Sequence, residues 1–316
     1  MLEIKLIEDS RTWEDRRPRL DVGFDPLNRG YNARAKVFEA FRKYFSNMPD
    51  DASPIIRERQ KILAQNGICE EDRYKMQAIL STAAYPNTVP TLFWTVYEIY
   101  SRPELLEVIR QEIANKAVRK SDHGFILDLA ALQTECHILL SAYQETQRTR
   151  HSQVAFRMVL EDTLLDGQYL LKKGNVLHIP AKPTHMDTSV WGPQAGVFDP
   201  YRFVPAGAGG DEARERTKIV PSSFLPWGRP PYMCPARQFA STEILMTTAL
   251  LVLRVDLTPA NGKGWGKPEV RSGMEVPTIP RPKEDMRLRV TAREEGAGSW
   301  AVVIGEGKTR ISLASG

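Results

Sequence analysis

A single cysteine carries the strongest chemical signal in this sequence. Cys234 lies in the stretch PWGRPPYMCPARQFA, residues 226–240, directly ahead of an apolar run typical of a helix. Pro235 suits the first position of that helix, so we expect Cys234 at the helix N-terminus, where unpaired backbone N–H groups favour a thiolate. The prolines around it fix φ and hold the loop in one shape. Such a thiolate is a ligand for a soft metal centre or a nucleophile; a buried, inert thiol is the alternative.

Two further patterns bring acids and bases together. Glu145 and Arg148 have the ExxR spacing, which places them on one helix face within pairing distance. The segment FDPYRF, residues 198–203, follows, and its Arg202 can join the pair. An ExxR pair by itself is usually a solvated surface pair, but this one closes an apolar helix and precedes the cysteine loop. The order of the three patterns therefore favours one functional assembly.

The elements that must position these residues are mostly helices. Apolar residues recur at helical spacing, and the expected helices cover residues 31–48, 53–65, 76–100, 103–118, 128–148 and 235–253. Alternation and the turn signals Asp166-Gly167 and Lys173-Gly174 predict short strands and hairpins between 156 and 180. One more strand is expected at 286–293. The predicted fold class is therefore mainly α, with small β-sheets (α+β).

Three segments complete this organisation. The segment 76–100 is apolar nearly all round, but Pro86 and Pro90 interrupt it, so we interpret it as a central buried helix that opens or kinks there. Proline, glycine and aromatic residues fill 181–233, which predicts an irregular but packed segment. We assign one domain to residues 1–294 and leave the tail, 295–316, unassigned.

Composition narrows the classes of function. The 316 residues carry a net charge of +4, with 42% hydrophobic and 26% charged residues, which is typical of a globular protein. A charge this small predicts no nucleic-acid partner. The three cysteines are scattered and match neither a CxxC pattern nor a zinc spacing. The N-terminus has no signal-peptide or anchor pattern, so we expect this chain by itself to be neither secreted nor anchored, and cytosolic.

In this order and spacing, the three patterns resemble the C-terminal part of a cytochrome P450. The stretch PNTVPTLFW, residues 86–94, is similar in style to the branch that contains cholesterol 7α-hydroxylase and prostacyclin synthase, and to many fungal members. The resemblance covers about residues 25–290. It implies the C-terminal two-thirds of that fold, truncated at the N-terminus so that the first helices and the membrane anchor are absent.

The resemblance implies a cofactor and the residues that hold it. Cys234 is implied as the axial thiolate ligand of the iron of haem b. Arg157 matches the position that usually holds a haem propionate, and Trp227 and Arg229 belong to the loop that contacts the cofactor. Each is expected to bind the cofactor.

The resemblance also assigns the remaining residues. Glu145, Arg148 and Arg202 are implied as structural ion pairs behind the haem, needed for folding and haem retention rather than for bond making. Thr88 matches the alcohol that hydrogen-bonds bound oxygen and relays protons. Asn87 replaces the neighbouring acid of the common pattern, and an amide cannot carry a net charge, so proton delivery needs water or another group.

The cysteine loop departs from the family pattern. Pro230 stands where the family commonly has a glycine, and proline cannot adopt a positive φ. Pro231 or Tyr232 replaces the usual basic residue, for which Arg229 is a substitute, and Ala236 replaces a second glycine. Because Pro230 re-aims the loop, we expect this chain by itself to bind haem weakly.

The function implied by the resemblance is a monooxygenase. It would oxidise an apolar small molecule with O2 and electrons from NADPH–cytochrome P450 reductase, at the cytosolic face of the endoplasmic reticulum, in secondary metabolism of a terpenoid, sterol or polyketide. Two alternatives stay open. One is a haem-thiolate isomerase or dehydratase that needs no external electrons, with which Asn87 is compatible. The other is a truncated, catalytically inactive remnant.

Overall fold

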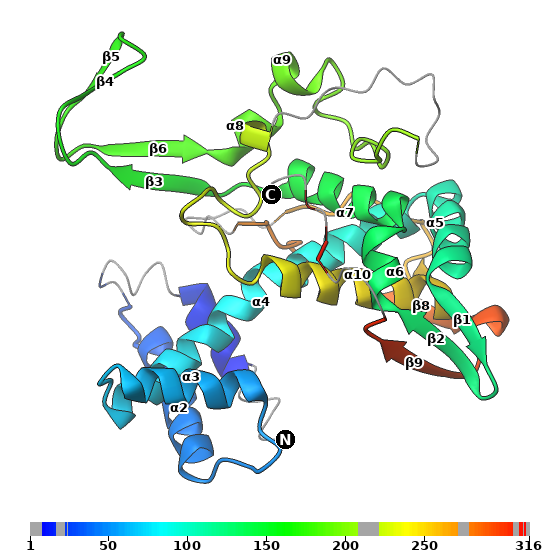
Figure 1. Cartoon of the computed structure of the whole chain (residues 1–316), viewed down its shortest axis with the longest axis horizontal. Coiled ribbons are helices and arrows are strands. Elements are labelled where there is room, and N and C mark those ends of the chain that lie inside the picture. Colours follow the sequence, from blue (N-terminus) through cyan, green and yellow to red (C-terminus); the bar gives the residue numbers. More distant parts are fainter. Residues whose placement is uncertain are drawn as a thin grey trace. The chain divides into compact units, whose positions relative to one another are not determined.

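The fold is mainly α-helical with small β-sheets, as the sequence predicts (Figure 1). A computed structural model describes residues 8–16, 23, 25–207, 221–270, 278–305, 310–311 and 313. The chain divides into two compact units. The first contains Met1–Asn87 and Ser272–Glu275, and the second contains Thr88–Arg271 and Val276–Gly316.

The first unit is a small helical assembly. Residues 8–16 are helical, and they are followed by α2 (Arg29–Ser46), α3 (Pro54–Gln65) and the beginning of α4 (Glu70–Tyr100). Its core contains Trp13, Ala33, Val37 and Ala78, with the rings of Trp13 and Phe38 meeting edge-on. Asn66 and Gly67 end α3, and Gly67 supplies the positive φ of 74° that such an ending favours.

Helix α4 is continuous, so it does not open at Pro86 and Pro90, whereas the alternative expectation of a kink there stays a prediction. The two prolines are four residues apart, so the carbonyl that Pro90 leaves without a donor belongs to Pro86 itself. The two backbone hydrogen bonds that the prolines remove therefore lie on one face of the helix. Near its end the helix is deeply buried, with Trp94 and Ile99 fully covered. Among the described helices, none combines the length and the apolar character needed to cross a membrane.

The second unit surrounds one large apolar core. Its helices are α5 (Pro103–Lys116), α6 (Leu129–Thr134), α7 (His137–Arg150), α8 (Ala181–His185), α9 (Thr188–Trp191) and α10 (Arg237–Arg254), with the 3₁₀ turns η1 (Pro221–Ser223) and η2 (Glu294–Gly296). Its strands are β1 (Val118–Ser121), β2 (Gly124–Asp128), β3 (Val154–Met158), β4 (Thr163–Leu165), β5 (Tyr169–Leu171), β6 (Val176–Pro180), β7 (Val255–Pro259), β8 (Leu288–Ala292) and β9 (Ser299–Val303).

The strands form four small sheets. One has the order β1-β2-β9, and the others are the pairs β3-β6, β4-β5 and β7-β8. The hairpins expected between residues 156 and 180 are present: Asp166 and Gly167, at φ 53° and 65°, turn the chain between β4 and β5. Strand β8 occupies most of the predicted 286–293 segment and pairs with β7.

The single helix expected over residues 128–148 is two helices, α6 and α7. Asp128 caps α6 by accepting hydrogen bonds from two backbone N–H groups of its first turn. The cap of α7 comes from α5, where the buried Glu112 carboxylate accepts from the backbone of Ile138 and Leu139 at 3.0–3.1 Å. The first turn of each helix thus has its own carboxylate acceptor, Asp128 for α6 and Glu112 for α7.

The described parts of the long segment after β6, residues 181–207 and 221–233, contain buried aromatic residues, as the aromatic content predicts; residues 208–220 lie outside the described residues. Trp191, Ala195 and Phe224 are buried together, and Phe203 packs against them. The ring centroids of Phe203 and Phe224 lie 4.9 Å apart. The guanidinium of Arg148, near the end of α7, lies 5.1 Å from the ring centre of Trp191, so this buried group contacts the end of α7.

Candidate functional site

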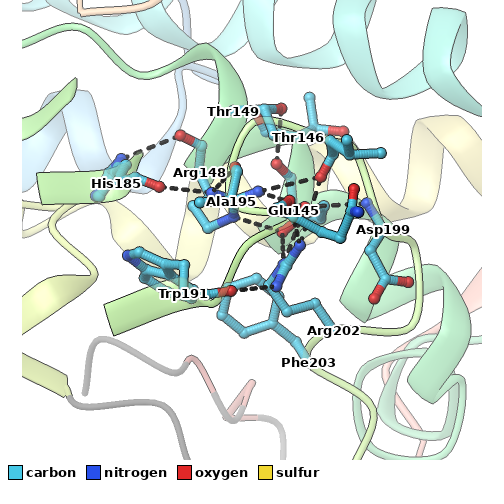
Figure 2. Close-up of polar contacts among 12 residues, drawn as sticks. Glu145, Thr146, Arg148, Thr149, His185, Trp191, Ala195, Asp199, Arg202 and Phe203 are labelled. Carbon is cyan, nitrogen blue, oxygen red and sulfur yellow. Dashed lines mark hydrogen bonds and ion pairs between the residues drawn. The ribbon is translucent and has the colours of Figure 1, made fainter. Parts of the chain in front are cut away.

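Three charged residues meet at the end of α7. The Arg148 guanidinium donates two hydrogen bonds to the Glu145 carboxylate, at 2.8 and 2.7 Å. Arg202, from the irregular segment, donates to both oxygens of the same carboxylate at 3.2 and 3.1 Å. Figure 2 shows the two guanidinium groups converging on Glu145. Glu145 and Arg148 are completely buried, and Arg202 nearly so.

The N–H groups of Arg148 and Arg202 that do not bind the Glu145 carboxylate donate to backbone carbonyls. Arg148 donates to the backbone carbonyls of His185 and Ala195 at 2.5 and 2.7 Å, and its guanidinium lies 5.1 Å from the ring centre of Trp191 (Figure 2). Arg202 donates to the Trp191 carbonyl at 3.2 Å. Because every buried charge is paired and hydrogen-bonded, the cluster escapes the large cost of an unpaired charge. It fastens the irregular segment to α7.

His185 extends the cluster toward the cysteine loop. Its Nδ1 donates to the Arg148 carbonyl at 3.2 Å, and its Nε2 accepts from the Leu225 N–H at 2.9 Å. These partners fix a neutral ring with the proton on Nδ1. Burial lowers the pKa of His185 to about 4. Sequence reasoning missed this residue, because no local pattern around it indicates partners so far along the chain.

The cysteine loop is closed by its own backbone. The Cys234 N–H donates to the Trp227 carbonyl at 2.8 Å, and the Tyr232 N–H donates to the Arg229 carbonyl at 2.8 Å. Gly228, at φ 78°, supplies the left-handed turn, which is the conformation that Pro230 cannot adopt. The loop therefore makes its turn two residues before the position that the family pattern reserves for glycine.

Helix α10 begins later than the sequence predicts. Its first residue is Arg237 and its N-cap is Ala236, so Pro235 lies in the preceding turn rather than at the first helical position. The carbonyl of Cys234 accepts from the backbone N–H of Arg237 at 3.4 Å and from its guanidinium at 3.2 Å. The thiol itself is half-buried and forms no disulfide. It stands one turn ahead of the helix and is joined to it through Arg237.

Helix α7 lies behind the cysteine loop. The Tyr143 hydroxyl is hydrogen-bonded to the Ser241 hydroxyl of α10 at 2.8 Å. Burial raises the pKa of the Tyr143 phenol, and the nearby Cys234 acts in the same direction through its charge. The same helix thus carries Glu145 and Arg148 at one end and contacts the cysteine helix through Tyr143.

Two buried N–H groups near the cysteine loop have no acceptor among the described residues. The indole Nε1 of Trp227 and the Nε of Arg237 are buried with no hydrogen-bond partner. The Arg157 guanidinium lies 4.9 Å from the ring centre of Tyr232, which places β3 beside the loop. Arg229 is half-buried in the loop. Buried donors of this kind require acceptors, and carboxylates are the acceptors that arginine binds best.

These residues fit a cofactor that carries carboxylates and a soft metal. A half-buried thiol can supply one soft ligand, and the unpartnered donors can receive the propionates of a haem. Among the described residues, no group of three or more His, Cys, Asp or Glu side chains is arranged to hold a bare metal ion. A macrocycle that brings its own equatorial ligands needs only the one thiolate.

Asn87 and Thr88 lie in the middle of α4. Asn87 is exposed and is the last residue of the first unit in that part of the chain, whereas Thr88 is half-buried and begins the second unit. The structure describes no contact between Thr88 and the cysteine loop. It therefore brings the Glu145 cluster together, places Arg157 beside the loop, and leaves the role of these two residues to inference.

Comparison with known proteins gives a consistent match. The family model "Cytochrome P450" matches residues 55–282. The cytochrome P450 monooxygenase nodJ of Hypoxylon pulicicidum is 33% identical over 290 residues, which are 90% of this chain and 56% of that protein. A cytochrome P450 monooxygenase of Gibberella zeae is 28% identical over 293 residues, 89% of this chain and 55% of that protein.

A human protein named 7-alpha-hydroxycholest-4-en-3-one 12-alpha-hydroxylase is similar over a shorter stretch. It is 30% identical over 206 residues, which are 62% of this chain and 41% of that protein. The chain thus spans about half the length of the relatives it matches.

Proposed function

The chain belongs to the cytochrome P450 family, and on that premise we propose that it carries the thiolate side of a haem-dependent monooxygenase. The observation that supports this most directly is the cysteine loop, in which a half-buried thiol stands beside buried donors that have no acceptor. Such an arrangement is unfavourable in isolation and becomes favourable when a carboxylate-bearing, thiolate-binding cofactor is present.

We assign the proximal roles as follows. Cys234 would be the thiolate ligand of haem b iron. Trp227 in the loop and Arg157 on β3 would donate hydrogen bonds to the propionates, and Arg229 would add a positive charge beside them. When bound, haem with a thiolate ligand supplies the electron density that favours cleavage of the O–O bond of dioxygen.

The Glu145 cluster has a positioning role in this proposal. Glu145, Arg148 and Arg202 take part in no bond-making step. They hold the segment that runs from His185 to Phe203 against α7, and α7 in turn packs on α10. A fixed α7–α10 pair keeps Cys234 at one position relative to the donors of its loop.

We assign proton delivery to bound dioxygen to residues of α4. The Thr88 hydroxyl can both donate and accept a hydrogen bond, so it can hold or pass a proton. The Asn87 amide can orient water or substrate by hydrogen bonding but cannot take up a charge. Proton delivery at this position therefore depends on Thr88 and ordered water.

The proposed substrate is an apolar small molecule, oxidised with O2 and with electrons from NADPH–cytochrome P450 reductase. The human relative is named for a sterol, 7-alpha-hydroxycholest-4-en-3-one, and a rat relative is named 25-hydroxycholesterol 7-alpha-hydroxylase. Fungal monooxygenases are among the similar proteins, which supports a place in secondary metabolism. We propose the cytosolic face of the endoplasmic reticulum as the location, as the sequence resemblance implies.

The test uses the carbon monoxide difference spectrum of the reduced protein. Wild-type protein is expected to give the absorption band of a thiolate-ligated haem, and Cys234→Ser is expected to lose that band together with reductase-dependent turnover. Cys69→Ser is the matched control, because Cys69 is exposed and distant in sequence from the loop. A thiolate band that persists in Cys234→Ser would overturn the ligand assignment, and turnover of a peroxide substrate without reductase would favour the isomerase alternative.

A further inference from the structure

The C-terminal tail, residues 295–316, is unassigned from sequence; its described residues, 295–305, 310–311 and 313, belong to the second unit, and the others lie outside the described residues. Its strand β9 pairs parallel with β2, from Gly124 opposite Ser299 to Asp128 opposite Val303, and the two strands lie side by side in Figure 1. The rings of Phe125 and Trp300 stack at 4.8 Å. The match to the family model ends at residue 282, so this tail lies outside the part of the chain that the match covers.

Two glycines show that the tail and its receiving strand are fitted to each other. A Cβ placed on Gly124 would lie 2.1 Å from the Ser299 carbonyl oxygen, and one on Gly305 would lie 2.2 Å from the Asp128 carboxylate. Both glycines have positive φ, 144° and 77°. Only residues without a side chain allow this approach of backbone to backbone and of backbone to carboxylate.

Beyond β9 the tail reaches the first turn of α10. Gln238 clamps the backbone of Ile311: its amide nitrogen donates to the Ile311 carbonyl at 3.2 Å, and its amide oxygen accepts from the Ile311 N–H at 2.9 Å. Ile311 is 2% exposed and Leu313 7%, and both belong to the main core cluster. The paired hydrogen bonds copy the pairing of a strand backbone, so they fix both the direction and the register of the tail.

This clamp acts next to the proposed ligand. Gln238 follows Arg237, whose backbone and side chain both bond to the Cys234 carbonyl. The tail, the first turn of α10 and the cysteine are thus joined through consecutive residues. We propose that the described residues of the tail (299–305, Ile311 and Leu313) act as a strap that sets the position of the first turn of α10, with Gln238 as the positioning residue for the Cys234 thiolate.

The inference rests on the proposed function, because it concerns the cysteine that is proposed to bind haem. A strap is needed at this point for a physical reason. The start of α10 has no side-chain cap from its own N-cap, Ala236, so its first turn lacks the acceptor that usually fixes a helix N-terminus. The clamp by Gln238 fixes that turn from outside instead. A first turn free to shift would change how the sulfur is presented.

The experiment compares two glutamine substitutions in the full chain. Gln238→Leu removes the clamp on the tail. Gln133→Leu is the matched control, because Gln133 also bonds a side chain of α10, donating to Thr242 at 2.7 Å, but does not touch the strap. The readouts are the carbon monoxide difference spectrum, the rate at which the thiolate band is lost on warming, and the denaturant midpoint of the haem-free protein.

The expected result separates positioning from general stability. Both variants are expected to lower the denaturant midpoint by similar amounts. Only Gln238→Leu is expected to lose the thiolate band faster, by roughly threefold to tenfold, as the loss of one or two hydrogen bonds allows. Gln238→Glu keeps the acceptor for the Ile311 N–H and is expected to fall between Gln238→Leu and the wild type.

A second test removes and restores the strap. A chain that ends at Gly298 is expected to lose the band as Gln238→Leu does, and a synthetic peptide of residues 299–316 added to it is expected to restore the band. Equal band loss in Gln238→Leu and Gln133→Leu would overturn the strap, because it would show only general destabilisation. Absence of the band from the wild type would instead refute the proposed function, so the two failures are distinguishable.

Discussion

The Glu145 cluster and the Cys234 loop differ in whether their buried donors have hydrogen-bond acceptors. In the cluster, the donors on Arg148 reach the carboxylate of Glu145 or a backbone carbonyl. In and beside the loop, Trp227 Nε1 and Arg237 Nε are buried without any acceptor. The cluster is therefore complete by itself, whereas the loop is complete only when something supplies acceptors.

This difference separates what stabilises the fold from what receives the cofactor. The cluster should be formed in the haem-free protein, because it needs nothing from outside the chain. Haem should stabilise the folded protein increasingly as its free concentration rises above its dissociation constant, since a ligand that binds only the folded state stabilises that state by mass action. Substitutions in the two regions should consequently affect different measurements.

The largest effect is expected from Arg148→Ala. It leaves the Glu145 carboxylate buried beside Arg202 alone and leaves two carbonyls without donors, so the free energy of unfolding of the haem-free protein should fall by about 3–5 kcal/mol. Urea denaturation measures it. Arg119→Ala is the control, since the Arg119–Asp128 pair is 3.4 Å long and Arg119 is largely exposed; its cost should stay within about 1 kcal/mol. Similar costs for the two variants would show that the cluster does not stabilise the fold.

Lowering the pH should reduce the free energy of unfolding by a comparable amount, through His185 beside the Glu145 cluster. His185 is neutral in the folded protein and its pKa is lowered to about 4 by burial, and burial lowers the pKa of the neighbouring His151 to about 3. The unfolded chain therefore binds more protons as the pH falls. Stability is complete above the ordinary histidine pKa, near 6.5, and the share of His185 is lost progressively down to about pH 4, at a cost of about 3 kcal/mol.

Urea denaturation between pH 7 and 4 measures this loss. His185→Asn provides the comparison, because the amide can still donate and accept but does not titrate in this range. The variant should show a shallower dependence on pH, with the share of His151 remaining. An unchanged pH dependence in His185→Asn would assign the acid sensitivity to other groups.

Only part of the Glu145 cluster can be predicted from the sequence. The ExxR spacing predicts that Glu145 and Arg148 share a helix face, because helix geometry alone decides it. It does not predict the carbonyls of His185 and Ala195, since these come from irregular chain whose path depends on packing. The cap of α7 by Glu112 is equally hidden, because the acceptor comes from α5 rather than from the residues ahead of α7.

The surroundings of Cys234 are likewise predicted only in part from the sequence. The sequence predicts a helix after Cys234, but Pro235 indicates a start that the structure moves to Arg237. Proline suits a first helical position without requiring one. The strap is invisible in sequence, because a tail with glycines and little periodicity gives no sign of the strand or the helix turn that it contacts. Local sequence patterns therefore predict the helices and strands, but they do not predict the long-range hydrogen bonds that join those elements around Cys234.

A smaller effect is expected from Pro230→Gly in the cysteine loop. Glycine restores a backbone N–H near the sulfur and allows positive φ, so haem affinity should rise about threefold or more. The haem-free protein should lose about 1 kcal/mol or less, because glycine makes the unfolded chain more flexible. Haem titration followed by absorbance measures the affinity. A fall in affinity would show that Pro230 preorganises the loop rather than weakening it.

The smallest change in stability, and the sharpest contrast with the cluster, is expected from Trp227→Phe. The substitution removes a buried N–H that has no partner in the described structure, so the haem-free protein should change by about 0.5 kcal/mol or less, in either direction. Haem affinity should fall by about threefold to tenfold, because one donor to a carboxylate is lost. Urea denaturation and haem titration on the same samples separate the two effects. If Trp227→Phe destabilises the haem-free protein as strongly as Arg148→Ala, the indole already has a partner without haem, and the loop would be as complete as the cluster.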